Sequence, residues 1–168
     1  MRRRFVFKQV SSLVLSVLLG AWSVGQPVGA QVLTPRVPQV DLKALEQQGL
    51  SIAQEAAQLA QFEQFDEALP RVELASQLAP QNSQIWALLG SLYLQKDELD
   101  KAIAALQRAR MLDASNAPVL FALGNAYFQQ QRYTQAVEAL QAGLKLKANI
   151  PGALFDLGNA YYMLKRYS

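Results

Sequence analysis

Histidine and cysteine, the side chains that most often serve as general bases, nucleophiles or transition-metal ligands, are both absent from all 168 residues. Without cysteine the chain can form no disulfide framework, carry no lipid on a thiol and perform no thiolate chemistry. Residues 31–168 also show no nucleophile paired with a base, no metal cluster and no phosphate-binding loop. We therefore expect a protein that is not an enzyme and that uses no cofactor and no metal ion.

One group of carboxylates is a candidate cation site. Asp97, Glu98 and Asp100 lie close together in the chain, but their spacing does not match a calcium-binding loop. Acidic side chains at the start of a helix stabilise it by interacting with the helix dipole. The interpretation as a helix start is therefore favoured over the interpretation as a cation site.

The charge of the chain gives no indication of a nucleic-acid partner. The whole sequence carries 16 basic and 13 acidic side chains, but four of the basic ones lie in residues 1–30. Residues 31–168 hold the other 12 together with all 13 acidic side chains, so their net charge is −1. A chain that is close to neutral lacks the basic patch that contacts with phosphates require.

The elements that would carry a binding site recur along the chain with a fixed period. Gly90, Gly124 and Gly158 recur with a period of 34, and Tyr93, Tyr127 and Tyr161 keep the same period. In the unit 83–116, the apolar residues recur at intervals of three and four, as on one face of a helix. A period of this length is typical of stacked supersecondary units, here pairs of helices.

The unit 83–116 also carries a recognisable motif. Trp86, Leu89, Gly90 and Tyr93, followed by Ala102 and Leu106, follow the spacing W-x2-L-G-x2-Y…A-x3-L. This spacing resembles the tetratricopeptide repeat (TPR), and the resemblance extends over residues 49–168. It implies an all-α fold, a right-handed superhelical solenoid of antiparallel helix pairs, over residues 41–168. The repeats would be 49–82, 83–116, 117–150 and a partial repeat, 151–168.

Two local expectations follow from the repeat. Glycine at a fixed place in a helix costs stability, so we expect Gly90 to face Ala102 and let the two helices of a pair approach closely. We also expect Asp66, Asp100, Thr134 and Ser168 to be the N-cap residues of the second helices. The last repeat holds one helix, so its apolar face should be exposed, and we expect the sequence to be part of a longer repeat protein.

In TPR proteins the first helices line a concave groove that binds a peptide. By resemblance, the groove positions of this chain include Ala87, Leu94, Gln95, Gln129 and Met163. The residues that we predict to contact a peptide there are Ser91, Phe121, Asn125, Phe128, Phe155, Asn159 and Tyr162.

Two interpretations of these groove residues stay open. The aromatic residues would form apolar pockets while the asparagines bond the peptide backbone, or the aromatic residues would only fill space between helices. None of the groove positions is basic, so a clamp for acidic chaperone tails is not expected.

The resulting functional prediction is a non-catalytic scaffold for protein–protein interaction that binds a protein or peptide partner in the groove and assists complex assembly. The alternative is the N-terminal, substrate-docking part of a larger enzyme whose catalytic domain lies beyond residue 168. Self-association through the last helix is a third option, which we interpret as an artefact of truncation.

Residues 1–30 have the layout of a secretory signal peptide. Three arginines at positions 2–4 precede a largely apolar run from Val10 to Val24, and Ala30 ends a stretch of small residues. The apolar run is short for a membrane span, so cleavage is favoured over an uncleaved anchor, with no span after cleavage. Residues 31–40 are interpreted as a linker. We expect export across the inner membrane to the periplasm or thylakoid lumen, or tethering by the anchor if it is not cleaved.

Overall fold

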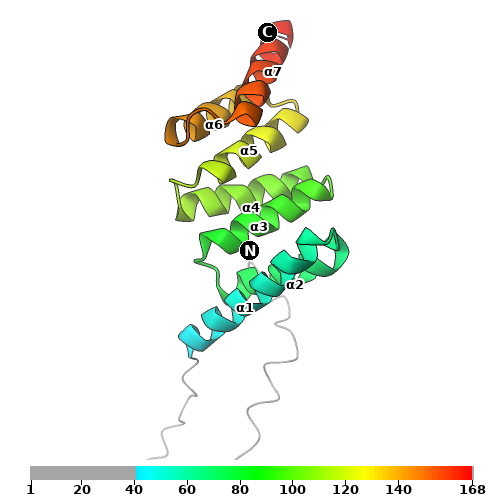
Figure 1. Cartoon of the computed structure of the whole chain (residues 1–168), viewed down its shortest axis with the longest axis vertical. Coiled ribbons are helices and arrows are strands. Elements are labelled where there is room, and N and C mark those ends of the chain that lie inside the picture. Colours follow the sequence, from blue (N-terminus) through cyan, green and yellow to red (C-terminus); the bar gives the residue numbers. More distant parts are fainter. Residues whose placement is uncertain (1–40, 168) are drawn as a thin grey trace, which may run out of the picture. The chain divides into compact units, whose positions relative to one another are not determined.

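The computed structural model describes residues 41–167, which form seven α-helices and no strand. Within this part of the chain the helices follow one another along a stack in sequence order (Figure 1). The helices are α1 (Leu42–Gln61), α2 (Phe65–Leu78), α3 (Ser83–Gln95), α4 (Leu99–Leu112), α5 (Ala117–Gln129), α6 (Tyr133–Leu146) and α7 (Pro151–Tyr167).

Each odd-numbered helix from α1 to α5 packs against the even-numbered helix that follows it, and α7 packs against α6. The predicted stack of helical hairpins is therefore confirmed for residues 41–167. The predicted signal peptide (1–30), the linker (31–40) and the predicted cap Ser168 lie outside the described residues.

The first helices of the pairs begin at side-chain caps. Asp41 Oδ1 accepts hydrogen bonds from the backbone amides of Lys43 and Ala44, at 3.0 and 3.1 Å. Asn82 and Asn116 cap α3 and α5 in the same way. These caps satisfy amide groups that have no partner within the helix, and they set where α1, α3 and α5 start.

The predicted caps of the second helices are wrong. The residues before α2, α4 and α6 make no capping bond with their side chains, and Asp66, Asp100 and Thr134 each lie at the second residue of their helix. The cause is a tight turn around residues in the left-handed region, Glu63 (φ 60°), Asp97 (φ 58°) and Gln131 (φ 61°). At the first of these turns the amide of Gln64 donates to the Leu59 carbonyl at 3.0 Å, as in a Schellman motif. Each second helix therefore begins earlier in the chain than the sequence predicted.

Instead of capping, Asp66 and Asp100 connect consecutive repeats. Asp66 Oδ1 accepts a hydrogen bond from Lys96 Nζ, and Asp100 Oδ1 accepts one from Gln130 Nε2 at 2.7 Å. Their negative charge in the first turn of a helix also suits the helix dipole.

Glycine allows the two helices of a pair to approach closely, but the residue opposite differs from the prediction. A Cβ added to Gly90 would lie 2.5 Å from Leu106 Cγ, and one added to Gly124 would lie 2.5 Å from Leu140 Cγ. Leu106 is one helical turn beyond Ala102, which is itself fully buried. Close packing at these glycines is therefore confirmed, with leucine and not alanine as the nearest neighbour.

Helix α7 lacks the cover that its counterpart α5 has. Leu154 and Tyr161 are 50% and 46% exposed, whereas the residues one repeat earlier, Leu120 and Tyr127, are 4% and 6% exposed. A Cβ on Gly158 would meet nothing within 4 Å. The expected apolar exposure on the last helix is thus observed.

Candidate functional site

The predicted groove positions lie on the first helices α3, α5 and α7, and two hollows open between successive first helices on that side. Hollow I lies between α1 and α3 and has a volume of about 460 Å³. Hollow II lies between α3 and α5 and has a volume of about 320 Å³. Gln84 and Leu88 of α3 line both hollows, so the two are neighbours separated by this helix.

The two hollows are built from the same positions of consecutive repeats. On its α1 side hollow I is lined by Leu50, Ala53, Gln54 and Ala57. The residues one repeat later line hollow II on its α3 side: Gln84, Ala87, Leu88 and Ser91. The opposite walls also correspond, because Asn82 and Ile85 in hollow I are replaced by Asn116 and Val119 in hollow II. The hollows are therefore equivalent sites one repeat apart.

The lining of both hollows is uncharged. Alanine, leucine, isoleucine, valine and proline supply the apolar surface, and serine, asparagine and glutamine supply the polar groups. Ser91 is exposed at hollow II, and its Oγ donates to the Ala87 carbonyl at 3.0 Å. Such a surface suits apolar side chains together with backbone amide groups, and it offers no cation to an acidic ligand.

A third, much smaller pocket lies between α5 and α7. It has a volume of about 20 Å³ and brings together Asn125, Phe128 and Asn159, all three predicted for the groove, with Asp156. Asn125 Oδ1 accepts a bond from Gln129 Nε2 at 2.5 Å. Asp156 is half-buried and makes no ion pair or hydrogen bond through its side chain with any described residue. This α5–α7 pocket therefore presents one unpaired carboxylate.

Phe121 and Phe128 pack against their own repeat. Phe121 is half-buried, and a Cβ added to Gly143 of α6 would lie 2.5 Å from its Cε1. Phe128 meets Tyr133 edge to face with ring centroids 5.6 Å apart. These contacts agree with the interpretation in which aromatic residues of the groove fill space between helices.

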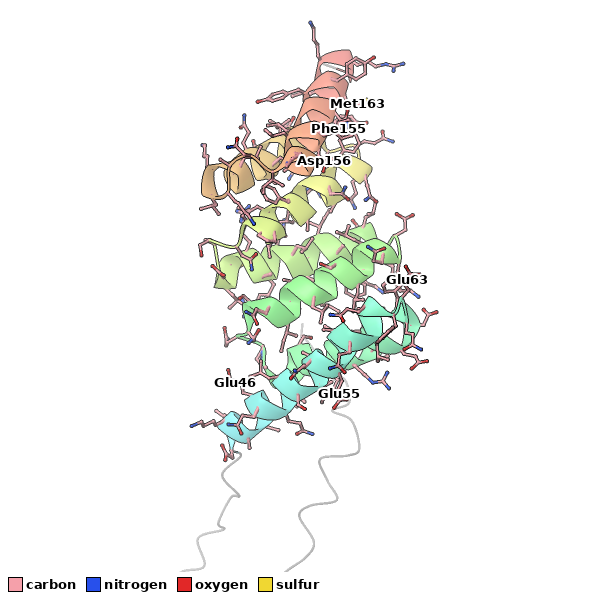
Figure 2. All side chains as sticks on the ribbon, viewed as in Figure 1. Glu46, Glu55, Glu63, Phe155, Asp156 and Met163 are labelled. Carbon is pink, nitrogen blue, oxygen red and sulfur yellow. The ribbon has the colours of Figure 1, made fainter. Side chains whose placement is uncertain are left out.

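Phe155 and Tyr162 differ from these two, because they are 70% and 66% exposed. Figure 2 shows Phe155, Asp156 and Met163 along α7, the last helix of the stack. Neither Phe155 nor Tyr162 lines hollow I, hollow II or the α5–α7 pocket.

The sequence prediction missed two groups of lining residues and, beside them, seven further residues that line the hollows: Asn82, Gln84, Ile85, Leu106, Asn116, Pro118 and Val119. The groove positions were not extended to the first repeat, although one repeat step back from Gln84, Ala87 and Ser91 leads to Leu50, Ala53 and Ala57. The second group is one repeat position that faces these spaces in every unit and was not marked at all: Gln54, Leu88, Ala122 and Asp156.

Hydrogen bonds between repeats hold the hollows in place. Tyr93 Oη donates to Glu73 Oε1 at 2.5 Å, and one repeat later Gln107 Nε2 donates to Tyr127 Oη at 2.7 Å. Burial and the bond to Glu73 raise the pKa of the Tyr93 phenol above its ordinary value. The tyrosines of the motif thus join each first helix to the second helix of the preceding repeat.

The acidic loop Asp97–Asp100 is used for structure. Glu98 forms an ion pair with Lys101 at 2.5 Å, while Asp100 binds Gln130. In the part of the chain that the structure describes, no three acidic side chains gather as metal ligands would. None of the helices in residues 41–167 combines the length and apolar character needed to cross a bilayer.

Sequence comparison identifies the repeats. A model of the TPR repeat matches residues 90–131 and again residues 124–165, in steps that agree with the period of 34. Residues 90–165 therefore match TPR repeats. No curated protein matches the sequence.

Solved structures with similar folds include several TPR domains. The first TPR domain of Spaghetti (RPAP3), bound to the HSP90 peptide SRMEEVD, has a TM-score of 0.69 and 20% identity over 71% of this chain and 95% of that one. The TPR domain of Arabidopsis OM64 has a TM-score of 0.68 and 15% identity over 70% and 98% of the two chains. MamA has a TM-score of 0.67 and 25% identity over 72% and 71%. The fold is therefore an all-α, TPR-like solenoid.

Proposed function

We propose that this TPR solenoid is a non-catalytic interaction module that binds a peptide or protein segment along the face of its first helices. The observation that carries the proposal is the recurrence of an uncharged hollow, of 460 and then 320 Å³, at the same positions of consecutive repeats. A row of equivalent hollows fits an extended chain that places one side chain in each. The face also includes Asn125, Asn159, Phe155 and Tyr162, which a bound segment can contact beyond hollow II.

The ligand differs in charge from the one bound by the Spaghetti domain. That domain is bound to a peptide that ends in two glutamates, a valine and an aspartate. Here neither hollow nor the α5–α7 pocket has a lysine or arginine in its lining, and the pocket contributes the carboxylate of Asp156. Because like charges repel, an acidic tail would bind weakly on this face.

Selection of binders from a random-peptide display library, with the immobilised full chain as bait, tests the proposal. Ser91→Trp places an indole in hollow II, since Ser91 is exposed and lines it. The control is Ala104→Trp, at an exposed position of α4 outside the linings of the two hollows and the α5–α7 pocket. Selected peptides should bind the wild type and the control alike and the Ser91 variant at least tenfold more weakly. If the selected peptides bind the Ser91→Trp variant as tightly as the wild type, they bind elsewhere and the proposal is wrong.

We also propose that the protein is exported, with residues 1–30 removed as a signal peptide, and that it acts in assembling a complex in the compartment it reaches. The basic start, the apolar run and the small residues before Gln31 support this proposal. Mass spectrometry of the protein expressed with its native leader should find Gln31 as the first residue in the exported fraction. An intact leader in the membrane fraction would instead establish a tethered protein.

A further inference from the structure

The spacing of hollows I and II restricts the conformation of a bound segment. Hollows I and II lie on the two sides of α3, which α1 and α5 each approach closely at a few residues, so the hollows are one helix diameter, about 10 Å, apart. A polyproline II segment has three residues per turn and rises about 3.1 Å per residue, so its residues i and i+3 lie on the same side about 9 Å apart. In a β-strand, by contrast, residues i and i+3 point to opposite sides.

The polar groups of the hollows fit the same conformation. Asn82 Oδ1 is occupied by the amides of Gln84 and Ile85, at 3.0 and 3.1 Å, so its NH₂ group is directed elsewhere and makes no hydrogen bond to a described residue. Asn116 repeats this arrangement at hollow II, where its Oδ1 accepts from Val119 at 3.3 Å. A polyproline II segment has no internal hydrogen bonds, so its carbonyl oxygens are free to accept from these two NH₂ groups.

The third repeat differs at the position that keeps hollows I and II open. Ala53 and Ala87 line the two hollows, whereas Phe121 occupies the corresponding position of α5. The ring of Phe121 fits because α6 carries Gly143 where the earlier repeats carry an alanine, as at Ala109. Between α5 and α7, one repeat after hollow II, lies the small α5–α7 pocket with the carboxylate of Asp156.

From these features we propose that the face binds a polyproline II segment with two apolar side chains three residues apart, followed within about one further turn by a lysine or arginine. The apolar side chains enter hollows I and II, Asn82 and Asn116 donate to carbonyl oxygens of the segment, and Asp156 attracts the cation. This inference rests on the proposed function, because it specifies the ligand of the same face.

Synthetic peptides test the spacing and the charge. The probe is a fluorescein-labelled, C-terminally amidated peptide of sequence Gly-Leu-Pro-Pro-Leu-Pro-Pro-Lys-Gly, titrated with the full chain and followed by fluorescence anisotropy. Moving the second leucine one residue closer to the first should weaken binding at least tenfold, because one hollow stays empty. Replacing the lysine by glutamate should weaken it about threefold or more at low salt, and the difference should shrink as salt is added. Equal affinity for the two leucine spacings would overturn the proposal.

Transferring a residue pair of the third repeat to the second repeat tests whether hollow II is the binding site. Ala87→Phe with Ala109→Gly gives the second repeat the pair found in the third, which closes hollow II with packing that this fold already contains. The control, Ala104→Trp, adds a large ring at an exposed position of α4 that lies outside the linings of both hollows and of the α5–α7 pocket. The first variant should bind the probe at least tenfold more weakly and the control within twofold of wild type, with equal far-UV circular dichroism. If the first variant does not fold, Ala122→Gln in hollow II serves for the same comparison.

The outcomes separate this inference from the proposed function. If library peptides bind and Ser91→Trp weakens them, but they lack the apolar spacing of three residues, the inference is wrong and the proposed function stands. If no selected peptide is sensitive to Ser91→Trp, both fail. If the probe binds the wild type and the Ala87→Phe, Ala109→Gly variant equally, hollow II is not its site and the inference is again wrong.

Discussion

Gly90 and Gly158 occupy the same position of two repeats, yet replacing each by alanine should change stability in opposite directions. Alanine favours a helix over glycine by about 0.5–1 kcal/mol, and this gain applies to both. At Gly158 nothing lies within 4 Å of the added methyl group, so Gly158→Ala should stabilise the protein by up to that amount.

At Gly90 the gain is outweighed by steric overlap. The new methyl carbon would lie 2.5 Å from Leu106 Cγ, 2.8 Å from its Cδ2 and 3.2 Å from its backbone nitrogen. Cγ is the branch point of the side chain, so Leu106 cannot avoid the overlap by turning only its end, and α3 must move away from α4. Overpacking of this kind costs about 1–3 kcal/mol, so after the helix gain the net loss should be up to about 2.5 kcal/mol.

Urea unfolding of the full chain, followed by circular dichroism at 222 nm, measures both changes. With a slope of about 1.5 kcal/mol per molar urea, a loss of about 1 kcal/mol lowers the midpoint by about 0.7 M. In a Leu106→Ala background the same Gly90→Ala change should destabilise much less, because Cγ and Cδ2 are gone and only the backbone nitrogen at 3.2 Å remains close. A Gly90→Ala protein as stable as Gly158→Ala would refute the assignment of Gly90 to close helix packing.

Three further predictions concern the tyrosine bonds and the Phe121 ring. Tyr93→Phe removes the 2.5 Å bond to Glu73 and should cost about 1 kcal/mol in urea unfolding, whereas Tyr161→Phe, at an exposed bond, should cost less than half of that. Burial and the bond to Glu73 raise the pKa of the Tyr93 phenol above its ordinary 10.0. The folded protein therefore holds this proton more tightly than the unfolded chain does. The stability that results is fully present below about pH 10 and falls as the pH rises further. Absorbance at 295 nm should therefore show as many tyrosines ionising near pH 10 in the wild type as in Tyr93→Phe, and one more in the wild type would contradict this. Gly143→Ala should destabilise by up to about 2.5 kcal/mol, because overpacking against the ring of Phe121, 2.5 Å from the new carbon, costs about 1–3 kcal/mol and the helix gain offsets about 0.5–1 kcal/mol of it. A loss of the same size in a Phe121→Ala background would show that the ring is not the cause.

Several features of the candidate site could be predicted from the sequence, and others depend on contacts that the sequence pattern does not contain. The repeat period placed Ser91 and Asn125 on the first helices, where they line hollow II and the α5–α7 pocket. Asp156 was missed because nothing in its neighbourhood marks it, and it lines the pocket only because α7 lies beside α5. The caps at Asp66 and Asp100 were misplaced because the left-handed residues Glu63 and Asp97 are not glycines, so no residue type indicated so short a turn.

The sequence by itself determined that this protein is a row of helix pairs, because the helical period and the repeat period are properties of residues close together in the chain. Only the tertiary structure decided which of its groove residues are available to a ligand. Phe121 and Phe155 hold the same repeat position, but Phe121 packs over Gly143 of α6, whereas Phe155 is 70% exposed on α7. The size of a hollow likewise depends on side chains from different helices, well separated along the chain, whose volumes meet only when the repeats stack.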